Sequence, residues 1–191
     1  MTRTSERLRI VAVSGSLHRP SSTTALVAAL SAAVAERVDA DVRVVELAHL
    51  GPLLGGVLSR DALPAEAEDA LVAIEHADLL VVGSPVYRAS FTGLFKHLFD
   101  FVGQHALVDV PVLLAATGGS HRHALTIEHQ LRPLFAFFQA LTLPVGVYAA
   151  SEDFDGGRVR CPEVLARIQA AADRALPYLG RLPAPVRPAA W

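Results

Sequence analysis

LRIVAVSGSLHRPSSTT, residues 8–24, is the stretch that decides the fold class of this chain. It opens with the apolar run Leu8–Val13, which is rich in β-branched residues and is typical of a buried strand. Ser14-Gly15-Ser16 ends that run, and the Ala- and Leu-rich segment Ser22–Val38 has the composition of a helix. A buried strand that turns directly into a helix predicts the start of a parallel sheet.

The same alternation of strand and helix continues along the chain. Apolar or alternating runs predict strands at Leu8–Val13, Val42–Leu47, Asp78–Gly83, Val110–Ala116 and Val145–Ala149. Helices are predicted at Ser22–Val38, Ala65–His76, Phe91–Val102, His123–Leu141 and Glu163–Leu179, and a loop rich in Gly and Pro at Leu50–Pro64. This pattern predicts an α/β fold, a doubly wound five-stranded parallel sheet with helices on both faces. We expect one domain over residues 1–180 and a Pro-rich tail over residues 181–191.

The composition bounds the class of protein. The chain has 191 residues, of which 52% are hydrophobic, and this excludes a disordered protein. The net charge of −2 argues against nucleic-acid binding. Its single cysteine, Cys161, forbids an intrachain disulfide, and the first residues show neither a signal sequence nor a membrane span. We therefore expect a cytoplasmic protein.

Hydroxyl side chains crowd the loop that follows the first predicted strand. Ser14, Ser16, Ser21, Ser22 and Thr23 lie where a helix begins, so free amide groups and the positive end of the helix dipole meet there. A helix start of this kind is suited to bind a phosphate. Neither the dinucleotide glycines nor a Gly-Lys-Ser/Thr follows, which leaves a mononucleotide phosphate. The alternative is that Ser21 or Ser22 merely caps the helix.

Two further loops are predicted at the same edge of the sheet. Gly83–Gly93 follows the third strand and Thr117–His121 follows the fourth. Glycines allow the backbone to approach a flat ring, and free amides bond its polar edge. Tyr87 is suited to line such a ring, or alternatively to pack as a loop aromatic on the next helix. The three loops together predict a site for a phosphate-bearing flat ligand.

These three motifs resemble those of the NADPH-dependent FMN reductase family. The resemblance rests on SGSL with SST at residues 14–23, on GSPVYR at 83–88 and on ATGGS at 116–120, and it spans Ile10 to Phe154. The segments Ser84–Gly103 and Leu113–Tyr148 are most similar to reductases of two-component alkanesulfonate and methanesulfonate monooxygenases. The resemblance implies a flavodoxin-like sheet of order 2-1-3-4-5 and an NAD(P)H-dependent FMN reductase.

The resemblance also implies roles for individual residues. Around the FMN phosphate and the isoalloxazine it implies Ser14, Ser16, Ser21, Ser22, Thr23, Pro85, Val86, Tyr87, Arg88, Thr117, Gly118 and Gly119. Many relatives carry Arg where this chain has His18, and Arg19 is the candidate to replace that contact. Hydride passes directly between stacked cofactor rings, so no catalytic side chain is assigned. The implied cofactors are FMN and NADPH or NADH, and the implied partner is an FMNH2-dependent monooxygenase.

The helix around His129 carries a local defect. Pro133 lies four residues later and has no N–H, so the His129 carbonyl loses its ordinary partner, a defect that a π-bulge absorbs. Relatives of the alkanesulfonate type have an inserted Tyr at this position, at a subunit interface. Apolar residues also cover more of this helix than one face requires: Ile127, Leu131, Leu134, Phe135, Phe137 and Phe138. We expect a homodimer or homotetramer with His129 near an active site; the alternative is a Pro-kinked core helix with an exposed His.

A metal site and two other functions are the alternatives to this interpretation. The spacing of His121, His123 and His129 does not place all three on one helix face, so no metal site is expected. The rival functions are a quinone, azo-dye or chromate reductase that keeps FMN bound, and a flavodoxin-type electron carrier. The choice between NADPH and NADH stays open, with Arg88 as a candidate for the extra phosphate.

Overall fold

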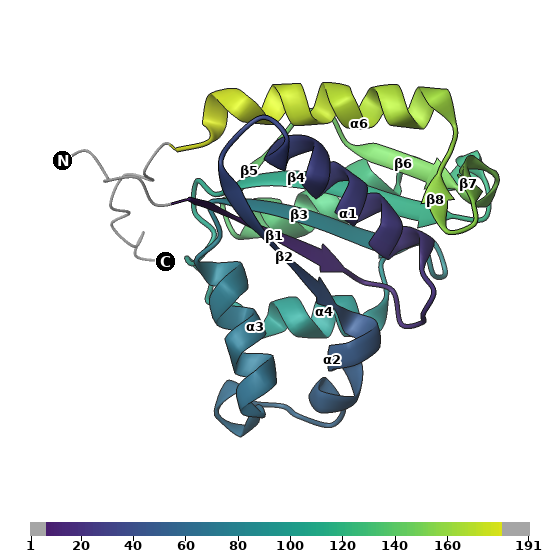
Figure 1. The fold of residues 1–191 in the computed structure, drawn as a ribbon. Helices are drawn as coiled ribbons and strands as arrows, with labels where there is room; N and C mark the ends of the chain where they lie inside the picture. The colour runs from purple at the N-terminus through teal and green to yellow at the C-terminus, as the bar shows by residue number, and fades with distance from the viewer. Residues whose placement is uncertain (1–6, 181–191) are drawn as a thin grey trace.

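The computed structural model describes residues 7–180, in which a parallel sheet forms the centre of the molecule (Figure 1). Its strands are β1 (Leu8–Ser14), β2 (Ala40–Glu46), β3 (Leu79–Pro85), β4 (Pro111–Gly118), β5 (Leu141–Thr142) and β6 (Val147–Ala150). The order is β2-β1-β3-β4-β5, and β6 also pairs with β4. The predicted doubly wound fold and its strand order are therefore confirmed. The Pro-rich tail lies outside the described residues.

Helices cover both faces of this sheet. They are α1 (Ser22–Ala35), α2 (Leu47–Leu54), α3 (Ala65–Glu75), α4 (Gly93–Asp100), α5 (Arg132–Phe137) and α6 (Pro162–Ala175). α1 and α6 lie together on one face, and α2, α3 and α4 lie on the other (Figure 1). A small hairpin of β7 (Phe154–Asp155) and β8 (Arg158–Val159) precedes α6. None of the helices in residues 7–180 combines the length and apolar character that a membrane span requires.

The last predicted strand is divided in two. β5 pairs with the start of β4, at Pro111 and Val112, and β6 pairs with its end, from Ala115 onward. Pro144 lies between the two pieces and has no N–H to donate to a neighbouring strand. The prediction of one strand at residues 145–149 therefore missed β5, and the second piece runs to Ala150.

The predicted loop at residues 50–64 is wrong at its start. α2 continues through Leu54 with Pro52 inside it. Leu47, Leu50 and Leu54 fall on one face of this helix and are buried in the core. Their burial outweighs the single hydrogen bond that Pro52 removes, because each buried leucine stabilises the fold by about 1.5–3 kcal/mol.

The predicted long helix at residues 123–141 is also broken. A 3-10 turn covers His121–His123, a π-helix covers Ile127–Leu131, and α5 follows. The Arg132 amide donates to the Ile127 carbonyl, five residues back, as in a π-helix. Pro133, which cannot donate an N–H, is the second residue of α5, which follows this turn. His129 thus lies within a π-helical turn of the backbone.

Most apolar residues of this region are used inside the domain. Ile127, Leu131, Phe135 and Phe138 are buried, and Phe135 packs edge-on against a ring of α4. Phe137 is the exception, with 61% of its surface exposed. The expected excess of apolar surface on this helix is therefore smaller than its composition indicated.

Candidate functional site

The three predicted loops meet at one edge of the sheet. β1, β3 and β4 are neighbouring parallel strands, and their carboxyl ends are in register: Ser14 lies beside Gly83, and Pro85 beside Thr117. In a doubly wound sheet, this edge is where ligands bind. The structure therefore brings together the loops that the sequence singled out.

The first loop combines a helix cap with hydroxyl groups that are hydrogen-bonded to nearby atoms of the same loop. Ser21 is the N-cap of α1, and its side chain accepts a hydrogen bond from the Thr24 amide. Ser14 is buried and its hydroxyl lies 2.8 Å from the Thr24 hydroxyl. Ser16 contacts the backbone of His18 through long hydrogen bonds of 3.2 and 3.4 Å. The Ser21 cap occupies the Thr24 amide, but the Ser22 and Thr23 amides before it have no intrahelical partner, so the helix start can still receive an anion.

Arg19 is held by a carboxylate at the end of β2. Its Nη2 lies 2.7 Å from Glu46 Oε1 and its Nε lies 3.1 Å from Oε2. This pairing raises the pKa of Arg19 through hydrogen bonding and charge attraction. A phosphate contact from Arg19 would have to share or break this ion pair.

Hydrogen bonds join the three loops to one another. The hydroxyls of Thr23 and Thr117 lie 2.6 Å apart and are buried, which ties the first loop to the third. The Val86 amide donates to the Thr117 carbonyl at 2.7 Å, which ties the second loop to the third. Thr92 Oγ1 donates to the Gly15 carbonyl at 2.9 Å, which ties the second loop to the first. Thr23 and Thr117 therefore act on the shape of the site, with their hydroxyls already paired.

The second loop contains a tight turn in an unusual backbone conformation. Tyr87 and Ser90 exchange both backbone hydrogen bonds, at 2.8 and 3.1 Å. The two residues between them, Arg88 and Ala89, have φ angles of 51° and 68°. The left-handed region costs a residue with a Cβ roughly 1–2 kcal/mol. Strained backbone of this kind is concentrated at functional sites.

The third loop packs against Tyr148 of β6. The Tyr148 hydroxyl donates to the Ser120 carbonyl at 2.6 Å. Burial, with a smaller effect of the Asp153 carboxylate, raises the pKa of Tyr148, so the phenol stays protonated and remains a donor. A Cβ on Gly118 would lie 2.3 Å from that hydroxyl, whereas a Cβ on Gly119 would meet nothing within 4 Å. Tyr148 therefore explains the glycine at 118, and Gly119 is the glycine with open space beside it.

The remaining predicted residues lie at the rim. Tyr87 is 42% exposed, and Arg88 is exposed and has no ion-pair partner among the described residues. His129 is exposed on the π-helix. Within residues 7–180 no group of three His, Cys, Asp or Glu side chains is placed to hold a metal ion. His121 instead lies 3.2 Å from Glu152.

Some residues at this edge were not found from the sequence. Glu46, Tyr148 and Gln130 come from β2, β6 and the π-helix, and no local motif marks them. Thr92 did carry a signal, because a threonine directly before the helical run that starts at Gly93 is a typical N-cap.

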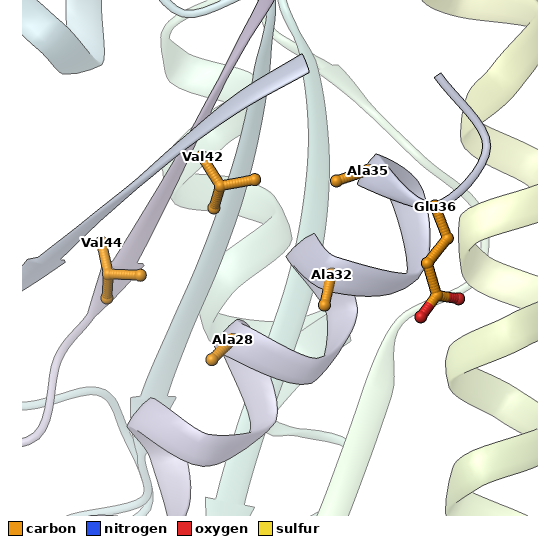
Figure 2. Close-up of a pocket in the computed structure, with 6 residues that line it drawn as sticks. All are labelled: Ala28, Ala32, Ala35, Glu36, Val42 and Val44. Atoms are coloured by element: carbon orange, nitrogen blue, oxygen red, sulfur yellow. The ribbon is translucent and has the colours of Figure 1, made fainter. Parts of the chain in front are cut away.

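A shallow apolar groove lies elsewhere, along α1 and the edge strand β2 (Figure 2). It is lined by Ala28, Ala32, Ala35, Glu36, Val42 and Val44. These side chains offer methyl groups and one carboxylate but no hydrogen-bond donor, so the groove does not suit a phosphate.

Comparisons with known proteins point to one family. The family model described as NADPH-dependent FMN reductase matches residues 8–155. A protein of Pseudomonas aeruginosa named FMN reductase (NADPH) is 54% identical over 172 residues, 90% of this chain and 92% of the relative. A Pseudomonas fluorescens protein named NADH-dependent FMN reductase SfnF is 53% identical over 176 residues, 92% of this chain and 94% of the relative.

Solved structures agree with this assignment. The apo form of an NADH:FMN oxidoreductase (EmoB) has a TM-score of 0.81 at 33% identity and covers 92% of each chain. An oxidoreductase of Corynebacterium diphtheriae has a TM-score of 0.80 at 36% identity, covering 92% of this chain and 98% of that one. The chain therefore belongs to the NADPH-dependent FMN reductase family and is an oxidoreductase that uses FMN and NAD(P)H.

Proposed function

We propose that FMN binds at the carboxyl edge of the sheet, with its phosphate at the first loop and its ring between the other two. Ser16, Ser21, Ser22 and the first amides of α1 would surround the phosphate. Pro85, Val86, Tyr87 and Arg88 would border one edge of the isoalloxazine, and Thr117, Gly118 and Gly119 the other.

The observation that carries this proposal is the hydrogen bonding among the loops. Thr23 with Thr117, Val86 with Thr117 and Thr92 with Gly15 link all three loops directly. A ligand that touches all three loops would therefore meet a surface already formed before it binds. Such preorganisation favours binding because little order has to be gained.

The proposed hydride transfer requires no chemical step from the side chains of the protein. FMN, when bound, accepts a hydride from the nicotinamide, and its own ring system holds that reactivity. The protein would orient the two rings and exclude water. No side chain is proposed as a general acid or base.

The phosphate placement is tested with Ser16→Asp. A carboxylate beside a phosphate repels it in a partly dry site, so the FMN dissociation constant should rise at least about tenfold, or about 1.4 kcal/mol. Fluorescence titration measures this. An unchanged affinity in a folded variant would place the phosphate elsewhere.

We further propose that reduced FMN leaves and serves an FMNH2-dependent monooxygenase. The motif resemblance to sulfonate-system reductases supports this, and relatives named FMN reductase have the flavin as the named substrate. Steady-state NAD(P)H oxidation with and without free FMN is the test. Turnover that depends on added FMN supports a diffusible product; a protein that purifies yellow and turns over without it would support the quinone, azo-dye or chromate reductase alternative.

The preferred nicotinamide is part of the same proposal. Relatives are named for NADPH and for NADH. Arg88, exposed at the rim, is the candidate for the extra phosphate of NADPH. Arg88→Ala should then raise KM for NADPH and leave KM for NADH unchanged. An equal change for both would remove Arg88 from this role.

We also propose a homodimer or homotetramer with the π-helical region at the contact. Leu125 and Phe137, at the two ends of this region, are 63% and 61% exposed, and His129 between them is exposed too. Large exposed apolar side chains at both ends of this region support a partner surface there. Light scattering should find an oligomer, and Phe137→Asp should weaken it. A monomeric wild type would refute the contact, and unchanged assembly and flavin release in His129→Ala would remove His129 from it.

A cytoplasmic location completes the proposal. The single cysteine fits a reducing compartment. Fractionation of cells that express the full chain would test it.

A further inference from the structure

A side-chain hydrogen bond links the second loop to the π-helix. Ser90 Oγ donates to Gln130 Oε1 at 3.0 Å, across 40 residues of sequence. Both side chains are half-buried. The bond joins the tight turn at Tyr87–Ser90 to a helix that is itself anchored in the core through Ile127 and Leu131.

The turn needs such an anchor, because its own sequence does not favour it. Arg88 and Ala89 both have positive φ angles, with hydrogen bonds between Tyr87 and Ser90 on either side. This is the geometry of a type I′ turn, in which Asn-Gly or Asp-Gly is the favoured pair. Arg-Ala carries a Cβ at both central positions and gains nothing locally from the left-handed conformation. Contacts from outside the turn must therefore hold it.

The position of Gln130 depends on the π-helix. The widened turn ends at Leu131, two residues before Pro133, which has no amide N–H to donate. Gln130 follows the exposed His129 and precedes the buried Leu131, so it lies at the boundary between solvent and core. The π-helix at residues 127–131 thus determines that the side chain of Gln130 lies against Ser90.

We propose that Gln130 is a positioning residue for FMN binding. It holds the Ser90 hydroxyl and so keeps the Tyr87–Ser90 turn in the conformation that borders the flavin ring. This inference rests on the proposed placement of the isoalloxazine beside Pro85–Arg88. It adds a residue outside all three loops to the flavin site.

The first test measures how firmly the turn is held in the flavin-free protein. Trypsin cleaves after arginine, and Arg88 is exposed at the centre of the turn. Ser90→Ala and Gln130→Met should each raise the rate of cleavage after Arg88 about 3- to 10-fold, the range that the loss of one hydrogen bond corresponds to. Melting temperatures should stay within a few degrees of wild type. Gln104→Met, in an exposed turn elsewhere, is the matched control and should leave the rate unchanged.

The second test reads FMN affinity by fluorescence titration. Each single variant should weaken binding about 3- to 10-fold, and the double variant should be no weaker than either single one, because both changes break the same bond. Gln130→Glu keeps an oxygen acceptor for the Ser90 hydroxyl. Unlike Gln130→Met, it should therefore retain the FMN affinity and the trypsin resistance of the wild type.

The outcomes separate this inference from the proposed site. Unchanged cleavage in both single variants, or fully additive losses of affinity, would overturn the role of Gln130. Faster cleavage with unchanged FMN affinity would also overturn it, because the turn would then not border the flavin. Ser16→Asp in the same titration reports on the phosphate placement independently: if it too has no effect, the proposed site itself is wrong.

Discussion

The contact between Gly118 and Tyr148 makes a quantitative prediction. A Cβ added by Gly118→Ala would lie 2.3 Å from the Tyr148 hydroxyl oxygen and 3.4 Å from the ring carbon that bears it. The hydroxyl is held in place by its 2.6 Å hydrogen bond to the Ser120 carbonyl, and Tyr148 is buried. The added methyl group must therefore displace the hydroxyl and break that hydrogen bond.

The magnitude follows from two costs. Overpacking a buried site costs about 1–3 kcal/mol, and the lost hydrogen bond costs about 1 kcal/mol more. Gly118→Ala should thus lower the free energy of unfolding by about 2–4 kcal/mol. Tyr148→Phe removes only the hydrogen bond and should cost about 1 kcal/mol.

The double variant discriminates between explanations. In Gly118→Ala with Tyr148→Phe the nearest atom to the new methyl group is the ring carbon at 3.4 Å, an ordinary contact distance. The double variant should therefore cost about 1 kcal/mol, which is about 2–4 kcal/mol less than the sum of the single variants. Gly119→Ala is the matched control, since a Cβ there meets nothing within 4 Å.

Urea unfolding of the flavin-free protein, followed by circular dichroism, measures these differences. Additive losses in the double variant would refute the assignment of the clash to the hydroxyl. So would a loss below about 0.5 kcal/mol for Gly118→Ala, a size typical of unremarkable surface changes.

Three further predictions test the packing, the loop links and the charges. Phe99→Ala should lower the free energy of unfolding by about 3–5 kcal/mol, because that ring is buried in the aromatic cluster between α4 and α5; a loss below about 1 kcal/mol would contradict this. Thr23→Val should cost about 1–3 kcal/mol by leaving the buried Thr117 hydroxyl unpaired, and adding Thr117→Val should recover part of that loss; a further loss would count against the pairing. The Arg132 hydrogen bond holds the pKa of Glu128 below its usual value, so the pair stabilises the fold at neutral pH and loses that contribution as the pH falls below about 4. Because Glu128 is half-exposed, Glu128→Gln should cost at most about 0.5 kcal/mol at pH 7, and in urea titrations this cost should shrink as the pH falls below about 4; a cost independent of pH would exclude the ion pair as its cause.

Local chemistry in the sequence determined the architecture. The alternation of apolar runs with amphipathic segments predicts a doubly wound sheet, because buried parallel strands and covering helices each impose their own period. The same pattern placed the three loops at one edge. The backbone defect at His129 also follows from local sequence, because Pro133 has no N–H to donate to the His129 carbonyl. The structure contains a π-helix at this place. The FMN contacts of these loops stay predictions.

Tertiary structure decided the features in which distant segments meet. Pro52 lies inside α2 because burial of leucines on that helix outweighs a lost hydrogen bond. The last strand divides at Pro144 because β4 pairs with both pieces in different registers.

The hydrogen bonds and contacts around the candidate site were likewise decided by the tertiary structure. Thr23 and Thr117, and Ser90 and Gln130, form pairs whose members are far apart in the chain, and Gly118 is required by a tyrosine on another strand. A sequence shows what each residue can donate, accept or bury. Which partner it meets depends on how the strands and helices pack, and only the folded chain contains that information.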